Sequence, residues 1–154
     1  MCVYEKLAKL GVQLPEAPPK GGVYLPVKYF CEKLAYVSGN GPDVGGVAFK
    51  RGKLGRDLTL EEGREAARLC AINILAVIHA NLGDLNKVKS IVKILAFVAS
   101  DSEFFEQPQV INGASEFLSE VFGPEIGLGA RSAIGTNVLP GNIPVEIELL
   151  FELK

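Results

Sequence analysis

Two long segments carry apolar residues at a helical spacing. In residues 60–82, apolar side chains recur every three to four positions and form one wide face, the pattern of a helix lying on a sheet. Thr59 followed by Glu62 forms a capping box for its start, and Gly83 suits a C-terminal cap. Residues 109–122 repeat the apolar spacing and stop before a Gly-Pro pair. The pattern therefore predicts two main helices.

Extended segments surround these helices. Residues 88–99 are rich in β-branched side chains and predict a long strand, although they also fit a helical period. Residues 130–135 and 144–148 predict two further strands, joined as a hairpin by a turn at residues 139–142. Shorter extended pieces are expected at residues 23–27, 28–31, 34–38 and 47–50.

The N-terminal part differs from the rest. Residues 3–10 predict a short amphipathic helix that ends at Gly11, and the Pro/Gly-rich residues 15–22 predict an extended connector. We therefore divide the chain into residues 1–22, a helix and connector, and residues 23–154, the main domain. The order of its elements predicts an α+β fold, in which two helices cover one face of a mostly antiparallel sheet.

Length and charge narrow the class of protein. The 154 residues fit one domain, and 48% hydrophobic with 22% charged residues is an ordinary globular balance. A net charge of −2 provides no basic field for nucleic acid or an anionic membrane. We find neither an uncharged run long enough to span a membrane nor the apolar core of a signal peptide. These features favour a cytoplasmic protein.

Residues that usually carry metal or nucleophilic chemistry are sparse. Cys2, Cys31 and Cys70 are far apart, which favours reduced packing residues over a zinc site or a disulfide framework. His79 is the one histidine in the sequence, and we expect a packed or partly exposed helix residue there. A glycine pair at residues 39–41 follows a strand, but the next helix starts about 20 residues later, which excludes a Rossmann fingerprint. We expect no metal and no cofactor.

Three charged side chains interrupt the otherwise apolar C-terminal strands. Arg131 lies on the first strand, while Glu146 and Glu148 share one face of the second under two-residue alternation. A cross-strand salt bridge on a solvated face would explain this pattern. A binding site would explain it equally well, because a guanidinium matches a carboxylate bidentately and a glutamate can orient or deprotonate water. Further polar candidates are Tyr24, Ser38 and Asn112.

Several segments, taken in order, resemble a known family. They are Tyr36–Pro42, the capped helix, Asn112, Ala130–Ala133 and Pro144–Glu148. Together these segments are similar to the YjgF/RidA family, the reactive-intermediate imine deaminases, from about Tyr24 to the C-terminus. The resemblance implies a chorismate-mutase-like α+β domain that assembles as a homotrimer, with the sheets as an inner barrel and sites in the clefts between subunits. The N-terminal helix and connector resemble a longer branch of the family.

The resemblance also implies roles for single residues. Arg131 matches the arginine that binds the substrate carboxylate, and Glu146 matches the acid that handles the attacking water or the leaving ammonia. Ala133 stands where typical deaminases carry cysteine, and its backbone amide can still donate to a carboxylate. The implied substrate-binding residues are Tyr24, Ser38, Gly39, Asn112, Arg131 and Ala133.

The activity implied by the resemblance is cofactor-free hydrolysis of 2-imino acids, or their enamine tautomers, to 2-keto acids and ammonia. The alternative is a non-catalytic protein that binds small carboxylates or keto acids, which would need Arg131 but not Glu146. The endoribonuclease activity in the family name fits less well, because RNA affinity depends on cationic phosphate contacts that an acidic chain lacks. The expected partners are a carboxylate-bearing small molecule and further copies of the chain, without nucleic acid or membrane.

Overall fold

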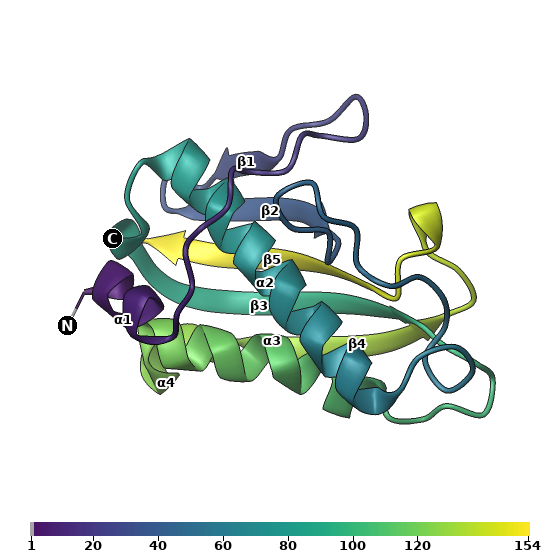
Figure 1. Cartoon of the computed structure of the whole chain (residues 1–154). Helices are drawn as coiled ribbons and strands as arrows, with labels where there is room; N and C mark the ends of the chain where they lie inside the picture. Colours follow the sequence, from purple (N-terminus) through teal and green to yellow (C-terminus); the bar gives the residue numbers. More distant parts are fainter. Residues whose placement is uncertain (1) are drawn as a thin grey trace.

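The computed structural model describes residues 2–154 and shows a single layer of helices on a single sheet (Figure 1). The longer helices are α1 (Val3–Lys9), α2 (Leu60–Leu82) and α3 (Gln107–Phe122), with one-turn helices α4 (Pro124–Gly127), η1 (Leu85–Lys87) and η2 (Pro140–Asn142). The strands are β1 (Val27–Phe30), β2 (Leu34–Asn40), β3 (Val88–Ala99), β4 (Ala130–Thr136) and β5 (Val145–Leu153). The predicted α+β fold class and the long strand over residues 88–99 are confirmed.

The sheet has the order β1-β2-β5-β3-β4, and its pairs are antiparallel except β3 with β4. The predicted hairpin between the two C-terminal strands is therefore wrong, because β3 lies between them. Parallel strands need a crossover connection, and α3 provides one between β3 and β4. The long, apolar β3 thus pairs along both of its edges.

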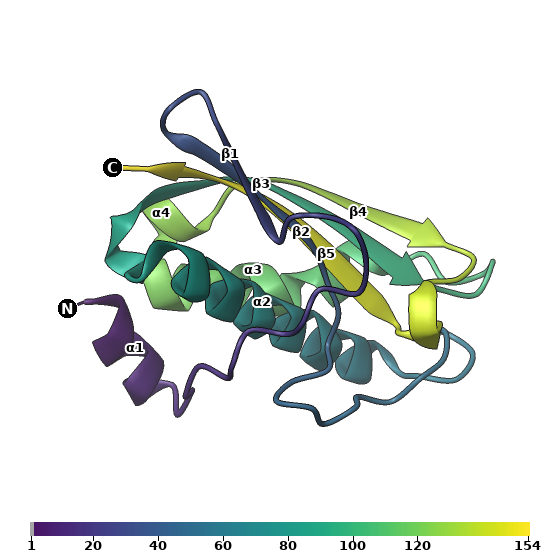
Figure 2. The ribbon, with the colours of Figure 1, turned by 90° about the horizontal axis from the view of Figure 1, so that it is seen from above.

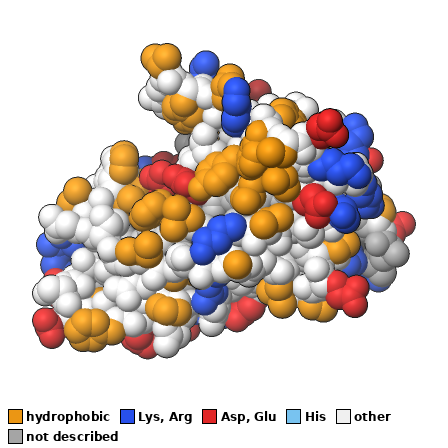
Figure 3. Space-filling model, turned by 180° about the vertical axis from the view of Figure 1, so that it is seen from behind, with side chains coloured by type: hydrophobic (Ala, Val, Ile, Leu, Met, Phe, Trp, Pro, Cys, Tyr) orange, Lys and Arg blue, Asp and Glu red, His pale blue; other side chains and the backbone are white. Residues whose placement is uncertain are grey.

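Both main helices cover the same face of the sheet, as Figure 2 shows. On that face, alternate residues of the central strands are buried: Ile94, Ala96 and Val98 of β3, and Val145, Ile147 and Leu149 of β5. No helix of residues 2–154 covers the opposite face, which we call the open face. Seen from behind, the open face gathers apolar side chains with isolated charged ones among them (Figure 3).

The capping signals of α2 are confirmed. The Glu62 amide donates to Thr59 Oγ1 at 3.3 Å, and Glu62 Oε2 accepts from the Thr59 amide at 2.8 Å. Gly83 takes a φ of 75° and donates to the His79 carbonyl at 2.8 Å. By length and composition α2 could cross a membrane, but 61% of its most apolar window is buried, as in a core helix.

The N-terminal helix joins the same hydrophobic core. Val3 and Leu7 of α1 are buried, and α1 packs beside α3. The connector then passes over α2 to reach β1 at the far edge of the sheet (Figure 1). Its path brings prolines of the connector close to the end of β2.

Two of the predictions for short segments differ from the structure. Residues 47–50 form no strand beyond one bridge between Val44 and Val47. The Phe49 amide donates to the Asp43 carboxylate instead of to a neighbouring strand. Cys31 is exposed instead of packed. It lies with Glu32 in the β1–β2 turn, where φ values of 48° and 59° suit the twist of a tight hairpin.

Candidate functional site

The structure divides the predicted site residues into two groups on opposite faces of the sheet. Arg131 lies opposite Ile94 of β3, which in turn lies opposite the buried Leu149 of β5. Glu146 lies three residues before Leu149 and points to the open face. Two strand spacings and three residues of rise place the two Cα atoms about 14 Å apart. The predicted cross-strand salt bridge between Arg131 and the glutamates is therefore wrong within one chain.

The first group, the Arg131 group, holds the guanidinium against α3. Arg131 Nη1 donates to Asn112 Oδ1 at 2.8 Å and to Ser115 Oγ at 3.1 Å, while Nη2 donates to the Pro108 carbonyl at 3.2 Å. All three acceptors are neutral, and no ion pair among residues 2–154 involves Arg131. The guanidinium is thus fixed in orientation while its charge stays unneutralised.

Local geometry explains this arrangement. Asn112 and Ser115 are three residues apart, so both project from one face of α3 toward β4. Ala133 follows Arg131 by two residues and faces the same side, opposite Ala96. The sequence had singled out Asn112 but not Ser115, although the three-residue spacing was a usable signal.

The second group, the Glu146 group, lies on β2 and β5. The Glu146 carboxylate is half-buried and lies directly against Gly39, so that a Cβ at position 39 would overlap Oε1. Burial, and to a smaller extent the charge of Glu148, raise the pKa of Glu146. A side chain at position 39 would therefore displace the Glu146 carboxylate, and this acid holds its proton more readily than an exposed glutamate.

β2 contains a β-bulge between Val37 and Asn40, at the position of Ser38 and Gly39. Val37 lies opposite Leu149 and Asn40 opposite Ile147, so three residues of β2 span two of β5. The displaced Ser38 bonds instead to the two residues before β1: its amide donates to the Pro26 carbonyl at 3.0 Å and its Oγ to the Leu25 carbonyl at 2.8 Å. The bulge lies at the point where Gly39 contacts the Glu146 carboxylate.

Glu148 has a partner of its own on the open face. The Tyr36 hydroxyl donates to Glu148 Oε2 at 2.6 Å, and this bond raises the pKa of Tyr36 to about 12. This hydrogen bond fixes the orientation of the Glu148 side chain beside Glu146. Pattern alone had not distinguished the two acids, whereas their contacts do.

Tyr24 lies near the Glu146 group, at the rim of a cavity of about 220 Å³ that we call the connector pocket. Its side chain is 42% exposed, and its hydroxyl accepts from the Gly21 amide at 3.0 Å. The connector pocket is also lined by Ser38 and Gly39 at the end of β2, and by Asn73 and Val77 of α2. The structure thus places three of the predicted residues, Tyr24, Ser38 and Gly39, on one wall.

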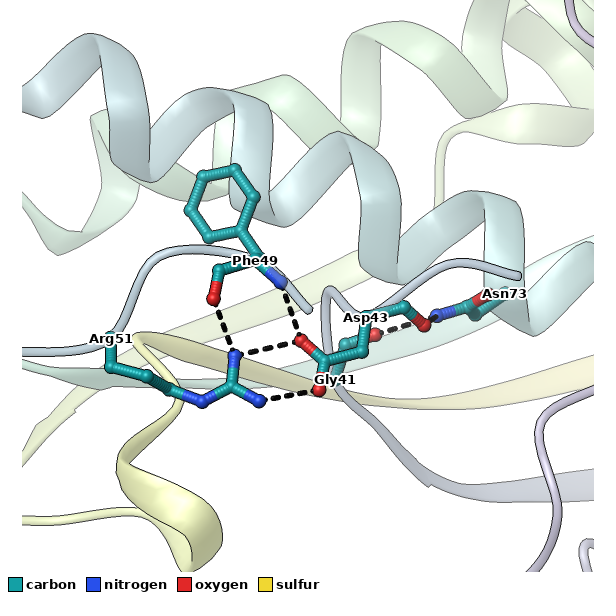
Figure 4. A network of polar contacts seen from close by, with 5 residues as sticks. All are labelled: Gly41, Asp43, Phe49, Arg51 and Asn73. Atoms are coloured by element: carbon teal, nitrogen blue, oxygen red, sulfur yellow. Dashed lines mark hydrogen bonds and ion pairs between the residues drawn. The ribbon is translucent and has the colours of Figure 1, made fainter. Parts of the chain in front are cut away.

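A polar network fixes the loop beyond β2 (Figure 4). Asp43 accepts two hydrogen bonds from Arg51, at 2.8 and 2.5 Å, and one from the Phe49 amide at 2.9 Å. Asn73 of α2 donates to the carbonyls of Gly41 at 2.9 Å and Asp43 at 2.7 Å. Asn73 was not among the predicted site residues, although a polar amide inside an apolar helix face was a signal.

Metal-binding geometry is absent from the described part of the chain. Residues 2–154 contain no cluster of three or more histidine, cysteine or acidic side chains placed to hold a metal ion. His79 is exposed and bonds through Nδ1 to the Tyr4 hydroxyl at 3.0 Å. Cys70 is buried in the core, where burial raises the pKa of its thiol, the setting of a packing residue.

Comparison with known proteins shows the family to which the chain belongs. The family described as "YjgF/chorismate mutase-like, putative endoribonuclease" matches residues 4–153. The chain belongs to the YjgF family. The family resemblance seen in the sequence is thereby confirmed, and the match covers the N-terminal helix and connector as well as the main domain.

Relatives of this YjgF protein extend over nearly all of its length. Protein TCP17 of Trypanosoma cruzi is 44% identical over 155 residues, covering 99% of this chain and 94% of that protein. The crystal structure of Atu1372 from Agrobacterium tumefaciens, a protein of unknown function, has a TM-score of 0.91 at 41% identity, covering 99% and 92% of the two chains. A Shewanella oneidensis protein described as a "putative endoribonuclease" has a TM-score of 0.94 at 29% identity, covering 99% and 100%.

Proposed function

We propose that this YjgF protein hydrolyses 2-imino acids, or their enamine tautomers, to 2-keto acids and ammonia. Water adds to the C=N carbon, the C–N bond then breaks, a C=O bond remains, and the nitrogen leaves as ammonia. The observation that carries this proposal is the Arg131 guanidinium, oriented by three neutral acceptors and without an acidic partner in residues 2–154. Such a group suits the carboxylate of a small acid.

Glu146 supplies the proton transfers in this proposal. A general base works best when its pKa lies near the working pH, and the pKa of Glu146 is raised by burial. As a carboxylate it takes a proton from the attacking water. As the acid so formed it returns that proton to the leaving nitrogen.

A complete site needs two copies of the chain. The Arg131 group and the Glu146 group lie on opposite faces of one sheet, so a single copy cannot bring both to one small substrate. Arg131 of one copy facing Glu146 of another would complete the site. The apolar side chains on the open face, including Phe30 at 39% and Ile134 at 47% exposure, suit burial between copies. The homotrimer implied by the family resemblance would provide such contacts.

Another protein with this fold has held a small carboxylate-bearing molecule. Escherichia coli TdcF, with a TM-score of 0.62 at 19% identity, was solved with bound serine. At this identity the likeness carries the fold and not the reaction, so the substrate class proposed here depends on the Arg131 group.

The test measures hydrolysis of an imine made in the cuvette by an amino-acid oxidase, with semicarbazide to trap the imine that remains. The native chain should speed imine loss, and Arg131→Ala should abolish this effect. Arg56→Ala removes an exposed arginine elsewhere, with 57% of its side chain accessible, and should behave as the native chain does. A native chain that leaves the spontaneous rate unchanged for several imines would disprove the proposal.

A non-catalytic carboxylate-binding protein is the second candidate, because the Arg131 group alone suffices to hold an anion. Calorimetry with 2-keto acids separates the two functions. For an enzyme, Glu146→Gln retains binding but loses imine hydrolysis. For a binding protein, the native chain and Glu146→Gln bind equally, and neither accelerates hydrolysis.

A further inference from the structure

Two charged side chains on the open face have no charged partner within residues 2–154. Lys93 precedes the buried Ile94 along β3, so its side chain leaves the sheet on the open side. Glu148 precedes the buried Leu149 along β5 and points the same way. Both charged side chains are half-buried, on a face where charged groups stand isolated among apolar ones (Figure 3).

Neutral hydroxyl groups hold the two charges apart. Lys93 Nζ donates to Ser132 Oγ of β4 at 2.7 Å. The Tyr36 hydroxyl of β2 donates to Glu148 Oε2 at 2.6 Å. In the sheet order, β2 and β4 are separated by three strand spacings, about 14 Å. The ammonium is therefore directed to one side of the open face and the carboxylate to the other.

Neighbouring charges in the same chain do not neutralise them. Lys89 and Glu152, further along β3 and β5, already pair with each other at 2.8 Å. Lys28 of β1 lies opposite Tyr36, but it is exposed and forms no ion pair with Glu148. The single chain thus leaves one cation and one anion of its open face without a charged partner.

Burial of the open face between copies would remove water from both charges. A charge without a charged partner is strongly disfavoured in such a setting, and the hydroxyls of Ser132 and Tyr36 replace only part of the lost hydration. An ammonium and a carboxylate that meet across an interface compensate each other. The fitting partner presents the same apolar face with the same two charges, which is a second copy of this chain.

The contact that completes the proposed site also brings these charges together. Arg131 and Ser132 are neighbours on β4, whereas Glu146 and Glu148 are two residues apart on β5, about 7 Å. If β4 of one copy lies against the β2–β5 side of the next, Arg131 approaches Glu146 there. The same contact moves Lys93 toward Glu148. Figure 1 shows β4 and β2 on opposite sides of the central strands, so this contact runs head to tail.

We propose that Lys93 of one copy forms an ion pair with Glu148 of the next copy, and that this pair sets the register in which the two copies meet. The partner of the open face is a second copy of this chain in a head-to-tail contact. The inference rests on the proposed function, which places the open face between copies, and it adds the two residues that select the partner.

The test reverses the two charges and measures the dissociation constant of the assembly by sedimentation velocity over a concentration series. Lys93→Glu or Glu148→Lys alone sets like charges against each other and should raise the dissociation constant at least about thirtyfold. The double variant restores opposite charges and should return to within about tenfold of the native value, because the hydroxyls of Ser132 and Tyr36 can donate or accept. Independent effects would instead add up to about a thousandfold loss.

Lys89→Glu is the matched control. It makes the same change on the same strand, at a cation whose acid partner lies in its own chain. Loss of that internal pair affects the free and the assembled chain alike, so the dissociation constant should change by less than about threefold. Dissociation of this variant as readily as Lys93→Glu would mean that any added acid on β3 disrupts assembly, and would count against the pair.

The outcomes separate this inference from the proposed function. Single variants that assemble like the native chain, or a double variant as weak as the sum of both, would overturn the pair while imine hydrolysis by the native chain stands. A native chain that assembles through the pair and accelerates no imine would overturn the proposed function instead. A native chain that sediments as a monomer would overturn the pair and the two-copy site together.

Neutral variants cover the case in which the reversed charges prevent folding, as judged by circular dichroism. Lys93→Met and Glu148→Gln each remove one charge. If the two residues pair, the double variant should weaken assembly no more than the stronger single variant, because the second change finds no charge left uncompensated. Additive losses would contradict the pair.

Discussion

Two inactive variants, Arg131→Ala and Glu146→Gln, are expected to restore activity when they assemble together. Each lacks one half of the proposed site. If a site takes Arg131 from one copy and Glu146 from the next, a mixed assembly contains some sites with both native groups. Variants that are inactive alone would then be active in mixture.

The structure gives the reason why one chain cannot supply both groups. Their Cα atoms are about 14 Å apart across β3, and the two side chains leave opposite faces of the sheet. Three hydrogen bonds hold Arg131 on the helix side. Bringing both groups to one substrate within a copy would require the sheet itself to come apart.

The fraction of complete sites can be calculated by assuming that equal amounts of the two variants assemble at random. Half of the copies have a native Arg131 and half have a native Glu146, so about a quarter of the interfaces carry both in a heterologous ring. Mixing the native chain with Arg131→Ala in equal amounts should instead leave about half of the sites complete. The two mixtures should therefore differ by a factor of about two.

The assay co-refolds the chains from denaturant, so that subunits randomise, and then measures hydrolysis of an imine formed in place. A separately refolded and then combined sample controls for slow exchange of subunits. If the co-refolded variants stay inactive while the native chain treated identically recovers, both groups act within one copy and the two-copy site is wrong. If Glu146→Gln is active by itself, Glu146 is not the proton-transfer group.

Three further changes test the Glu146 group. Gly39→Ala should displace the Glu146 carboxylate and lower imine hydrolysis about a hundredfold, while 2-keto acid binding measured by calorimetry persists; unchanged hydrolysis would contradict the contact. Glu146→Gln should raise the melting temperature at pH 7, because a carboxyl whose pKa is raised by folding costs stability when ionised. The gain should fade as the pH falls through the raised pKa and below the ordinary value of 4.5, because native Glu146 becomes neutral there as well. Tyr36→Phe should cost about 1–3 kcal/mol in urea unfolding through loss of the bond to Glu148, whereas Tyr29→Phe, whose hydroxyl has no partner within residues 2–154, should cost close to nothing.

Local patterns in the sequence were sufficient for most single elements. The capping box at Thr59 and the glycine at position 83 bounded α2 because they act on amide and carbonyl groups within one turn. Two-residue alternation placed Glu146 and Glu148 on one face of β5, since successive side chains of a strand point to opposite sides. These signals depend only on residues a few positions apart.

The tertiary structure alone decided how those elements meet. Alternation within one strand does not reveal which face a distant strand presents, so the sequence could not show that Arg131 and Glu146 point away from each other. The insertion of β3 between β4 and β5 depends on the crossover through α3 and on burial across the whole sheet. The role of Asn73 likewise depends on the packing of α2 against the loop after β2, where its amide donates to two backbone carbonyls. The sequence by itself determined the helices, the strands and the chemistry available, while long-range packing decided that this chemistry is split between two surfaces, because strand pairing and face selection are set by contacts between residues far apart in the chain.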